Sequence, residues 1–289
     1  MNPLPELQSS GVPIREGMWT PAGSTRTLFY RLWHPANATV LLVVVHGFGE
    51  HGGRYAPVAE AFARYGISVA IPDLWGHGRS GGTRGDQVSF EQYVEDLRAM
   101  TSEVFLPATG QGRYAVYGHS FGGLVAIHWA LGRVRELDRL VVQSPLLAVG
   151  FPIPAWKTGV ARWLARHWPA ARLAMHLNAD ALSHDAGVVT AYRRDRLVHN
   201  RMSARVYVGA LQAAEAACAR AAGIQSPTLV LYGEADHIVS VDAVRRWADR
   251  LTCQKRVMAF PDMRHELHHE AVREDVLKIV REWVTGAAG

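Results

Sequence analysis

The sequence predicts an α/β protein with a mostly parallel central sheet, helices on both faces of that sheet, and one inserted helical cap. Two observations lead to this fold class. Short apolar runs recur along the chain with helical patterns between most of them, and one interval of 77 residues interrupts the alternation. Alternating strands and helices are typical of a parallel sheet covered by helices. An ordinary crossover between strands is far shorter than the interrupting interval, which is therefore expected to be an insertion.

The strands are predicted from six short apolar runs that are continuous rather than alternating, as in sheets buried on both faces. They lie at 40–45, 67–71, 114–117, 140–142, 228–232 and 257–260. An antiparallel hairpin over 17–33, turning at 21–23, is expected before them. Helical patterns are found at 55–65, 90–105, 124–133 and 242–251.

The cap is expected at 147–223, which leaves 1–146 and 224–289 as the core. The interval contains Phe151, Trp156, Trp163, Trp168, Tyr192 and Tyr207. It also has ten Lys and Arg against four Asp and Glu, a net charge of +6, whereas the whole chain has +5. This surface is either an ordinary solvated one or a basic, aromatic face that contacts anionic lipid at a membrane.

Composition excludes several other classes of protein. A chain of 289 residues with 48% hydrophobic and 20% charged residues can bury a large core and is not broadly disordered. The basic residues form no tract interleaved with aromatics, so no nucleic-acid partner is expected. Cys218 and Cys253 are too few for a disulfide framework and are expected to be buried free thiols. Residues 1–10 lack the pattern of a signal peptide, and no apolar run could span a bilayer, so a cytoplasmic location is expected, with peripheral membrane contact left open.

The segment 118–123, Gly-His-Ser-Phe-Gly-Gly, lies between a predicted strand and a predicted helix. A serine in a G-x-S-x-G turn of this kind is lifted out at the carboxyl edge of the sheet, where the helix N-terminus points at it. Ser120 is therefore the candidate nucleophile. A plain glycine-rich turn is the alternative interpretation.

A serine nucleophile needs a base, and the base needs an acid that orients it. Asp236 follows a late predicted strand, and His265 follows the last one, so both are expected at the same edge as Ser120. The alternatives are Glu234 and Asp242 for the acid, and His268 and His269 for the base. The oxyanion would need backbone N–H donors, for which Phe121 and Phe48 are the candidates because one follows the nucleophile and the other lies in the glycine-rich loop 46–55.

The same C-terminal stretch, 265–269, also fits the zinc-binding pattern H-E-x-x-H. A zinc site needs a third ligand, and nothing in the sequence singles one out, although Glu282 is available. Zinc would also remove the base from Ser120. We therefore expect neither a metal nor a cofactor.

Four segments carry a family resemblance: HGFGEHGGRY at 46–55, DLWGHGRSGG at 73–82, GHSFGG at 118–123 and GEADHIV at 233–239. Together with the cap segment 182–199 they resemble the monoacylglycerol lipase and lysophospholipase branch of the α/β-hydrolases, over about residues 19–283. The resemblance implies the α/β-hydrolase fold. It also implies a catalytic triad of Ser120, Asp236 and His265, with Phe48 and Phe121 as oxyanion donors.

The resemblance further implies where a lipid substrate would bind. Glu50, Arg54 and His268 match positions around a small polar pocket for the glycerol end, and Tyr192 matches a cap residue near the acyl tunnel. The alternatives are a structural ion pair for Glu50 and Arg54, an exposed His268 and a core role for Tyr192. The chain departs from the family at Phe121, where methionine is usual, at Trp75, where arginine is usual, and at Arg196, where proline is usual.

The expected function is hydrolysis of monoacylglycerols to fatty acid and glycerol through an acyl-enzyme, with a small lipid ester as the partner. A lysophospholipase and a broad carboxylesterase are the nearest alternatives. An aminopeptidase would need an acidic patch for the substrate amine, which the basic cap disfavours. A ligand-binding protein without catalysis would have no need of the three triad residue types.

Overall fold

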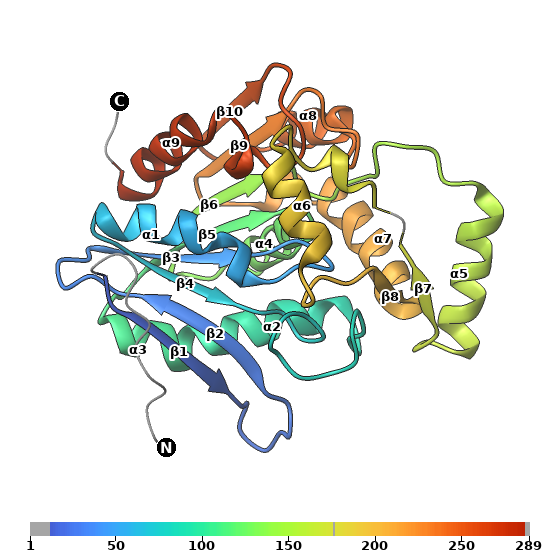
Figure 1. Cartoon of the computed structure of the whole chain (residues 1–289), viewed down its shortest axis with the longest axis horizontal. Coiled ribbons are helices and arrows are strands. Elements are labelled where there is room, and N and C mark those ends of the chain that lie inside the picture. The colour runs from blue at the N-terminus through green and yellow to red at the C-terminus, as the bar shows by residue number, and fades with distance from the viewer. Residues whose placement is uncertain (1–11, 176, 287–289) are drawn as a thin grey trace.

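The computed structural model describes residues 12–175 and 177–286, and its central element is an eight-stranded mixed sheet (Figure 1). The strand order is β1-β2-β4-β3-β5-β6-β9-β10. β2 pairs antiparallel with both of its neighbours, β1 and β4, and every other pair of neighbouring strands is parallel. The bounds are β1 Ile14–Trp19, β2 Leu28–Trp33, β3 Val40–Val45, β4 Ile67–Pro72, β5 Tyr114–His119, β6 Leu137–Gln143, β9 Thr228–Gly233 and β10 Lys255–Phe260. The predicted fold class is confirmed. The expectation about a signal peptide concerns residues 1–10, which lie outside the described residues.

Two apolar cores lie on opposite faces of this sheet, and successive residues of one strand alternate between them. In β3, Leu41 and Val43 belong to one core, whereas Leu42 and Val44 belong to the other. All four are fully buried. This explains why the central strands read as unbroken apolar runs in the sequence.

Helices cover both cores (Figure 1). The first core packs against α2, α4, α7 and α8, and the second against α1 and α9. The bounds are α1 Ala56–Arg64, α2 Phe90–Met100, α4 Phe121–Leu131, α8 Val241–Asp249 and α9 Arg273–Thr285; a π turn at Thr101–Phe105 leads from α2 into the short α3, Leu106–Thr109. Ser89 and Ser240 cap the starts of α2 and α8 by accepting a backbone N–H, which satisfies donors that a helix leaves free.

The segment between β6 and β9 holds α5 Ala155–His167, β7 Arg172–Ala174, α6 Ala186–Arg194, β8 Arg201–Ser203 and α7 Ala204–Ala219. It is mostly helical, as expected, but β7 and β8 pair as a small antiparallel sheet that the helical prediction did not include. α7 packs onto the core, whereas α5 lies at the end of the molecule farthest from β1 (Figure 1). None of the described helices is long and apolar enough to cross a membrane.

The two cysteines are free, but each is half-buried rather than buried as expected. Both pack at the margin of the first core, beside α7 and β9. The expectation was wrong because these positions lie where the core meets solvent.

Candidate active site

Ser120 occupies a strained turn between β5 and α4. Its φ of 54° is positive, which is unusual for a residue other than glycine. The conformation is held by two backbone hydrogen bonds, from Ser120 N to Gln143 O and from Leu146 N to Ser120 O, each 3.0 Å. A Cβ atom at Gly122 would overlap the Val45 carbonyl oxygen, so the turn also needs a small residue there. The surrounding structure thus enforces a backbone strain that presents the serine at the sheet edge.

Asp236 and His265 form a buried pair at the same edge. His265 Nδ1 donates to Asp236 Oδ2 at 2.7 Å, and the other carboxylate oxygen accepts the N–H groups of Ile238 and Val239 at 2.8 and 3.0 Å. Burial would raise the pKa of the Asp236 carboxyl, but His265 and these hydrogen bonds lower it. Burial likewise would lower the pKa of His265, but the Asp236 charge raises it. The pair can therefore accept and stabilise a proton on the imidazole.

The His265 ring is also close to the nucleophile turn. It lies 4.6 Å, between ring centroids, from His119, the residue that precedes Ser120. In this conformation no hydrogen bond joins the Ser120 hydroxyl to His265 among the described contacts. Such bonds are often long in a ligand-free site and tighten when substrate binds. Neither Glu234, which pairs with Arg245, nor Asp242 contacts His265 among these contacts.

The loop after β3 lies against the nucleophile. A Cβ atom at Gly47 would come within 3.4 Å of the Ser120 Cβ. The Gly47 N–H donates to Glu50 Oε1 at 2.6 Å, which fixes the backbone on the approach to Phe48. The rings of Phe48 and Phe121 meet edge to face at 5.4 Å. Both candidate oxyanion donors are therefore on segments that converge on Ser120.

A buried charged cluster links this loop to the segment that carries His265. Arg54 donates to Glu50 and makes two hydrogen bonds with Glu266, at 2.6 and 2.7 Å. Burial would raise the pKa of the Glu266 carboxyl, but the Arg54 guanidinium holds it well below its usual value. Glu50 and Arg54 thus form the structural ion pair that the sequence left as an alternative. The sequence did not indicate Glu266 as the third member.

Gln143, at the end of β6, determines which ring nitrogen carries the proton in two neighbouring histidines. Its amide Nε2 donates to His119 Nδ1 at 3.2 Å and to His268 Nδ1 at 2.9 Å. An amide nitrogen has only protons to offer, so both Nδ1 atoms must accept and both rings must carry their proton on Nε2. Burial lowers the pKa of His119 to about 3 and that of His268 well below its usual value, so both rings are neutral.

His268 is therefore fully buried and not exposed, as one interpretation of the sequence had allowed. Its ring stacks on Tyr55 at 4.8 Å. Its Nε2–H is a buried donor with no hydrogen-bond partner in the part of the chain that the structure describes. A buried donor of this kind is costly unless water or a ligand satisfies it.

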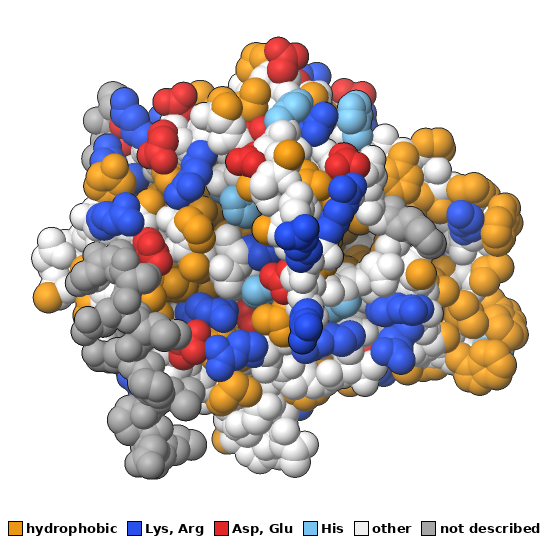
Figure 2. Space-filling model, viewed as in Figure 1, with side chains coloured by type: hydrophobic (Ala, Val, Ile, Leu, Met, Phe, Trp, Pro, Cys, Tyr) orange, Lys and Arg blue, Asp and Glu red, His pale blue; other side chains and the backbone are white. Residues whose placement is uncertain are grey.

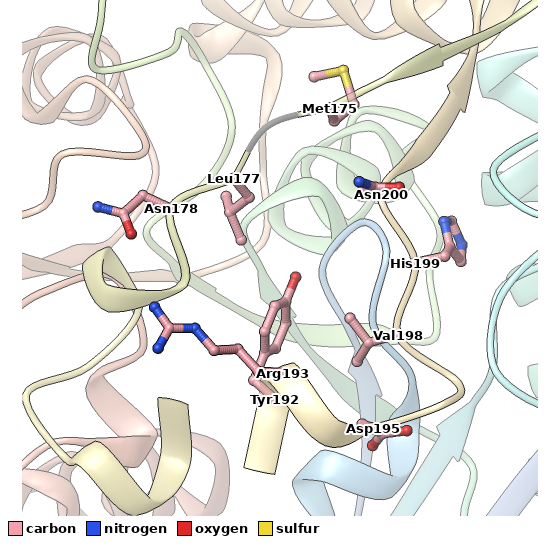
Figure 3. Close-up of a pocket in the computed structure, with 9 residues that line it drawn as sticks. All are labelled: Met175, Leu177, Asn178, Tyr192, Arg193, Asp195, Val198, His199 and Asn200. Carbon is pink, nitrogen blue, oxygen red and sulfur yellow. The ribbon is translucent and has the colours of Figure 1, made fainter. Parts of the chain in front are cut away.

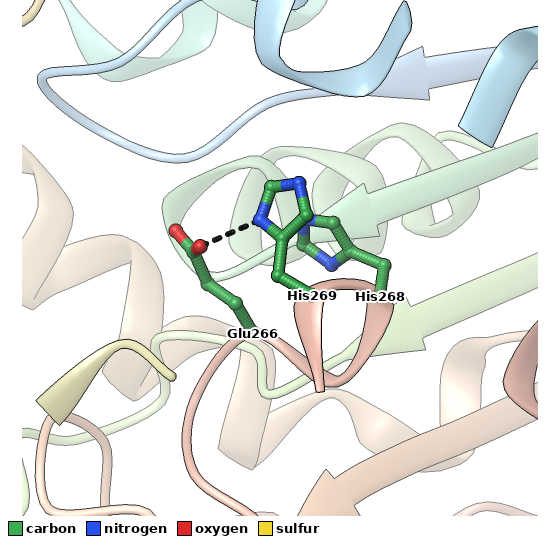
Figure 4. Close-up of side chains that lie close together, drawn as sticks. All are labelled: Glu266, His268 and His269. Atoms are coloured by element: carbon green, nitrogen blue, oxygen red, sulfur yellow. Dashed lines mark hydrogen bonds and ion pairs between the residues drawn. The ribbon is translucent and has the colours of Figure 1, made fainter. Parts of the chain in front are cut away.

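Glu266, His268 and His269 place three potential metal ligands within 4.8 Å of one another (Figure 4). The donors do not suit a cation. The Glu266 carboxylate already accepts from the Arg54 guanidinium and from His269, and the positive guanidinium would repel a metal ion. The stretch 267–269 is a 3₁₀ turn rather than an α-helix, so the histidines of the H-E-x-x-H pattern are not stacked one helical turn apart.

A cavity of about 500 Å³ lies above the loop after β3 (Figure 3). Every residue that lines it comes from the cap: Met175, Leu177, Tyr192 and Val198, together with the polar or charged Asn178, Arg193, Asp195, His199 and Asn200. The His199 N–H donates to the Gly49 carbonyl at 2.8 Å, which attaches this wall directly to the loop. The Tyr192 ring also covers the Arg54 guanidinium at 4.9 Å. Tyr192 thus borders both this cavity of mixed lining and the polar cluster.

Comparison with known proteins agrees with this geometry. Residues 36–272 match the Hydrolase_4 family, described as serine aminopeptidase S33. A monoacylglycerol lipase of Mycolicibacterium smegmatis is 30% identical over 260 residues, which is 89% of this chain and 92% of that protein. The phospholipase YtpA of Bacillus subtilis is 27% identical over 86% of this chain and 96% of its own.

Among solved structures, the monoacylglycerol lipase of Paleococcus ferrophilus superposes with a TM-score of 0.83 at 30% identity, covering 90% of this chain and 99% of that one. The family match spans most of the chain and includes every candidate catalytic residue. The chain therefore belongs to the Hydrolase_4 family of α/β-hydrolases, in the branch that contains the monoacylglycerol lipases, which confirms the resemblance found in the sequence.

Proposed function

We propose that the protein hydrolyses monoacylglycerols to fatty acid and glycerol, with Ser120 as the nucleophile. The observation that carries this proposal is the buried hydrogen-bonded pair of Asp236 and His265 beside the strained Ser120 turn. The relatives named as monoacylglycerol lipases support a lipid ester as the substrate.

In the first half of the reaction, His265 Nε2 takes the Ser120 proton while Ser120 Oγ attacks the ester carbonyl carbon. The N–H groups of Phe48 and Phe121 stabilise the oxyanion that forms. Asp236 holds the imidazole and stabilises its positive charge. The imidazolium then protonates the leaving glycerol oxygen as the carbon–oxygen bond breaks, which leaves an acyl-enzyme.

In the second half, water takes the place of glycerol. His265 removes a proton from the water as the oxygen attacks the acyl carbonyl. Collapse of the second tetrahedral intermediate breaks the bond to Ser120 Oγ, which recovers its proton from His265. Fatty acid leaves and the starting state is restored.

The two ends of the substrate would meet different surroundings. The cavity lined by Met175, Leu177 and Tyr192 offers apolar side chains to the acyl chain. At the glycerol end, the unsatisfied Nε2–H of His268 offers a donor to a hydroxyl. Glu50 and Arg54 are already paired with each other. In this proposal they shape the polar end of the substrate site, and they bind glycerol only through hydrogen-bonding positions that the ion pair does not use.

A lysophospholipid is the second candidate substrate, because one relative is named a phospholipase. An aminopeptidase, as the family description would suggest, is disfavoured by charge. The buried carboxylates of Glu50 and Glu266 both already pair with Arg54, and that of Asp236 is hydrogen-bonded to His265, so a substrate amine would have to displace an existing partner.

The test is fatty-acid release from a long-chain monoacylglycerol, with Ser120→Ala measured in parallel and a lysophosphatidylcholine and an aminoacyl anilide as competing substrates. Preferred turnover of the monoacylglycerol that disappears in Ser120→Ala supports the proposal. Preferred turnover of either other substrate overturns it. Labelling by a fluorophosphonate, expected in the native protein and lost in Ser120→Ala, shows whether the serine is activated whichever substrate is used.

A further inference from the structure

Polar contacts between the cap and the core gather beside α6. Figure 2 shows charged and histidine side chains there, whereas hydrophobic side chains prevail at the end of the molecule that α5 occupies in Figure 1. The cap segment 179–185, which leads into α6, is hydrogen-bonded to the segment that carries His265. Hydrogen bonds are directional, so a junction of this kind fixes the relative position of the two segments.

His265 lies on a stretch of chain that has no regular secondary structure of its own. Residues 261–266, directly after β10, form neither helix nor strand. The core holds the backbone of His265 through Ser144, whose Oγ donates to the His265 carbonyl at 3.1 Å. The position of the imidazole therefore also depends on what holds the residues before and after it, Arg264 and Glu266.

Both of these flanking residues are hydrogen-bonded to the cap. The Arg264 guanidinium donates from Nη1 to the carbonyl oxygens of Asp180 and Ser183, at 2.7 and 3.0 Å. The Glu266 N–H donates to the Leu182 carbonyl at 2.9 Å. The cap therefore holds the candidate base from both sides.

The same stretch of the cap makes further bonds a few residues later. Ser183 Oγ donates to the His269 carbonyl at 2.6 Å. Glu270 Oε1 accepts from N–H and Nδ1 of His184, at 3.2 and 3.0 Å, and from the N–H of Arg264 at 3.1 Å. Ser183 and Glu270 are buried, so these bonds are shielded from competing water. One carboxylate thus joins the cap to the residue that precedes the candidate base.

Apolar packing supports the same junction. Leu182 is buried in a small cluster of cap residues, against which Ile238 also packs. Ile238 donates its N–H to the Asp236 carboxylate at 2.8 Å. The cap segment 179–185 therefore contacts the loops of both the candidate acid and the candidate base.

We propose that Arg264 and Ser183 are positioning residues that hold His265 in place for catalysis. They act through the bonds between the cap and the segment 264–270, and neither needs to contact substrate. The proposal rests on the serine mechanism of the proposed function, but on no particular ester. A reacting group misplaced by about 1 Å can lose about 10²-fold in rate. A purely structural tie would behave differently, because its loss would lower the stability of the fold without changing the rate of each folded molecule.

The experiment uses Arg264→Met, which keeps a long side chain that cannot donate a hydrogen bond. Hydrolysis of p-nitrophenyl butyrate reports on the triad whichever lipid ester is cleaved, and the total fluorophosphonate bound counts the competent active sites. We expect kcat per labelled site to fall about 10–100-fold while KM changes less than about twofold, because the base is displaced and the substrate site is not. The rate of fluorophosphonate labelling should fall by a similar factor.

Two further variants grade the effect. Ser183→Ala loses the bond to His269 but keeps the backbone carbonyl that accepts from Arg264, so its kcat per labelled site should fall only about 2–10-fold. Arg264→Lys keeps a cationic donor for one of the two cap carbonyls and should recover part of the rate lost in Arg264→Met.

The matched control is Arg250→Met. Arg250 Nη1 also donates to a backbone carbonyl of the cap, that of Cys218 at 3.1 Å, but it neighbours no candidate catalytic residue. Its kcat per labelled site should equal that of the native protein. Fewer labelled sites at an unchanged kcat per site in Arg264→Met would make Arg264 a structural residue and overturn the proposal, as would equal losses of rate in the two variants.

Failure of the proposed substrate gives a different result. A native protein that is labelled and cleaves p-nitrophenyl butyrate, but releases no fatty acid from a monoacylglycerol, would overturn the substrate and leave the positioning of His265 to be decided by the variants. A native protein that is not labelled at all would overturn both.

Discussion

Arg54 and Glu266 are joined by two hydrogen bonds, from Nη1 to Oε1 at 2.6 Å and from Nη2 to Oε2 at 2.7 Å. Glu266 directly follows His265, and Arg54 lies in the segment that also carries Phe48. One buried ion pair therefore connects the two sides of the candidate active site, which lie 212 residues apart in the sequence. The planar guanidinium gives this connection a fixed geometry.

Removing the guanidinium should destabilise the fold. We expect Arg54→Met to lower the free energy of unfolding by about 3–5 kcal/mol, because it leaves two buried carboxylates without their cation. Urea denaturation measures this loss. Arg113→Met is the matched control, since its pair with Asp138 is exposed, and it should cost less than ~1 kcal/mol. Equal losses in the two variants would show that the buried pair does not support the structure.

The pH dependence of catalysis should report on His265. Only the neutral imidazole can accept the Ser120 proton, so kcat/KM should fall as pH is lowered through the pKa of this ring. Since Asp236 raises that pKa, the midpoint should lie above 6.5. Asp236→Asn should shift the midpoint to lower pH and reduce kcat by about 10³–10⁴-fold. An acid limb that is unmoved in Asp236→Asn would assign it to another group.

The buried donor of His268 should matter for the alcohol part of the substrate. We expect His268→Phe to reduce kcat/KM for a monoacylglycerol about tenfold, a loss that fits one hydrogen bond. The methyl ester of the same fatty acid has no hydroxyl to bind and serves as the control substrate. Equal losses on both esters would indicate that His268 supports the site without contacting the polyol.

The glycines offer a paired test of the strained turn. Gly122→Ala should destabilise the protein by about 1–3 kcal/mol and reduce activity, because its Cβ would overlap the Val45 and His46 carbonyl oxygens. Gly159→Ala, in α5, has open space around the new atom and should stabilise the protein by ~0.5–1 kcal/mol. Thermal unfolding distinguishes the two, and a harmless Gly122→Ala would contradict the tight packing of the turn.

The sequence was sufficient to predict where the main elements lie. Unbroken apolar runs identified strands buried on both faces, and β3 matches its predicted range without change. Because the carboxyl ends of parallel strands share one edge, the same argument brought Ser120, Asp236 and His265 to neighbouring positions. Asp236 and His265 could be placed at that edge from the order of the strands alone, because they follow β9 and β10.

The interactions that hold the site together were not predictable. Glu266 gave a signal only as part of a zinc-like string, and its partner is on another loop. Gln143 reads as an ordinary strand end, because nothing local marks a side chain that reaches two histidines. β7 and β8 have three residues each, and strands of that length leave no periodic pattern.

The hydrogen bonds from the Gln143 amide give the histidines of the site different roles. With their Nδ1 atoms engaged, His119 and His268 behave as permanent N–H donors, comparable to asparagine or tryptophan side chains. In the proposed mechanism His265 takes up the proton, although its ring lies 4.6 Å from that of His119, which in turn lies 5.1 Å from that of His268. Replacing Gln143 would leave each Nδ1 free to carry the ring proton instead, so a residue that need never touch substrate sets the tautomer of two rings beside the candidate base.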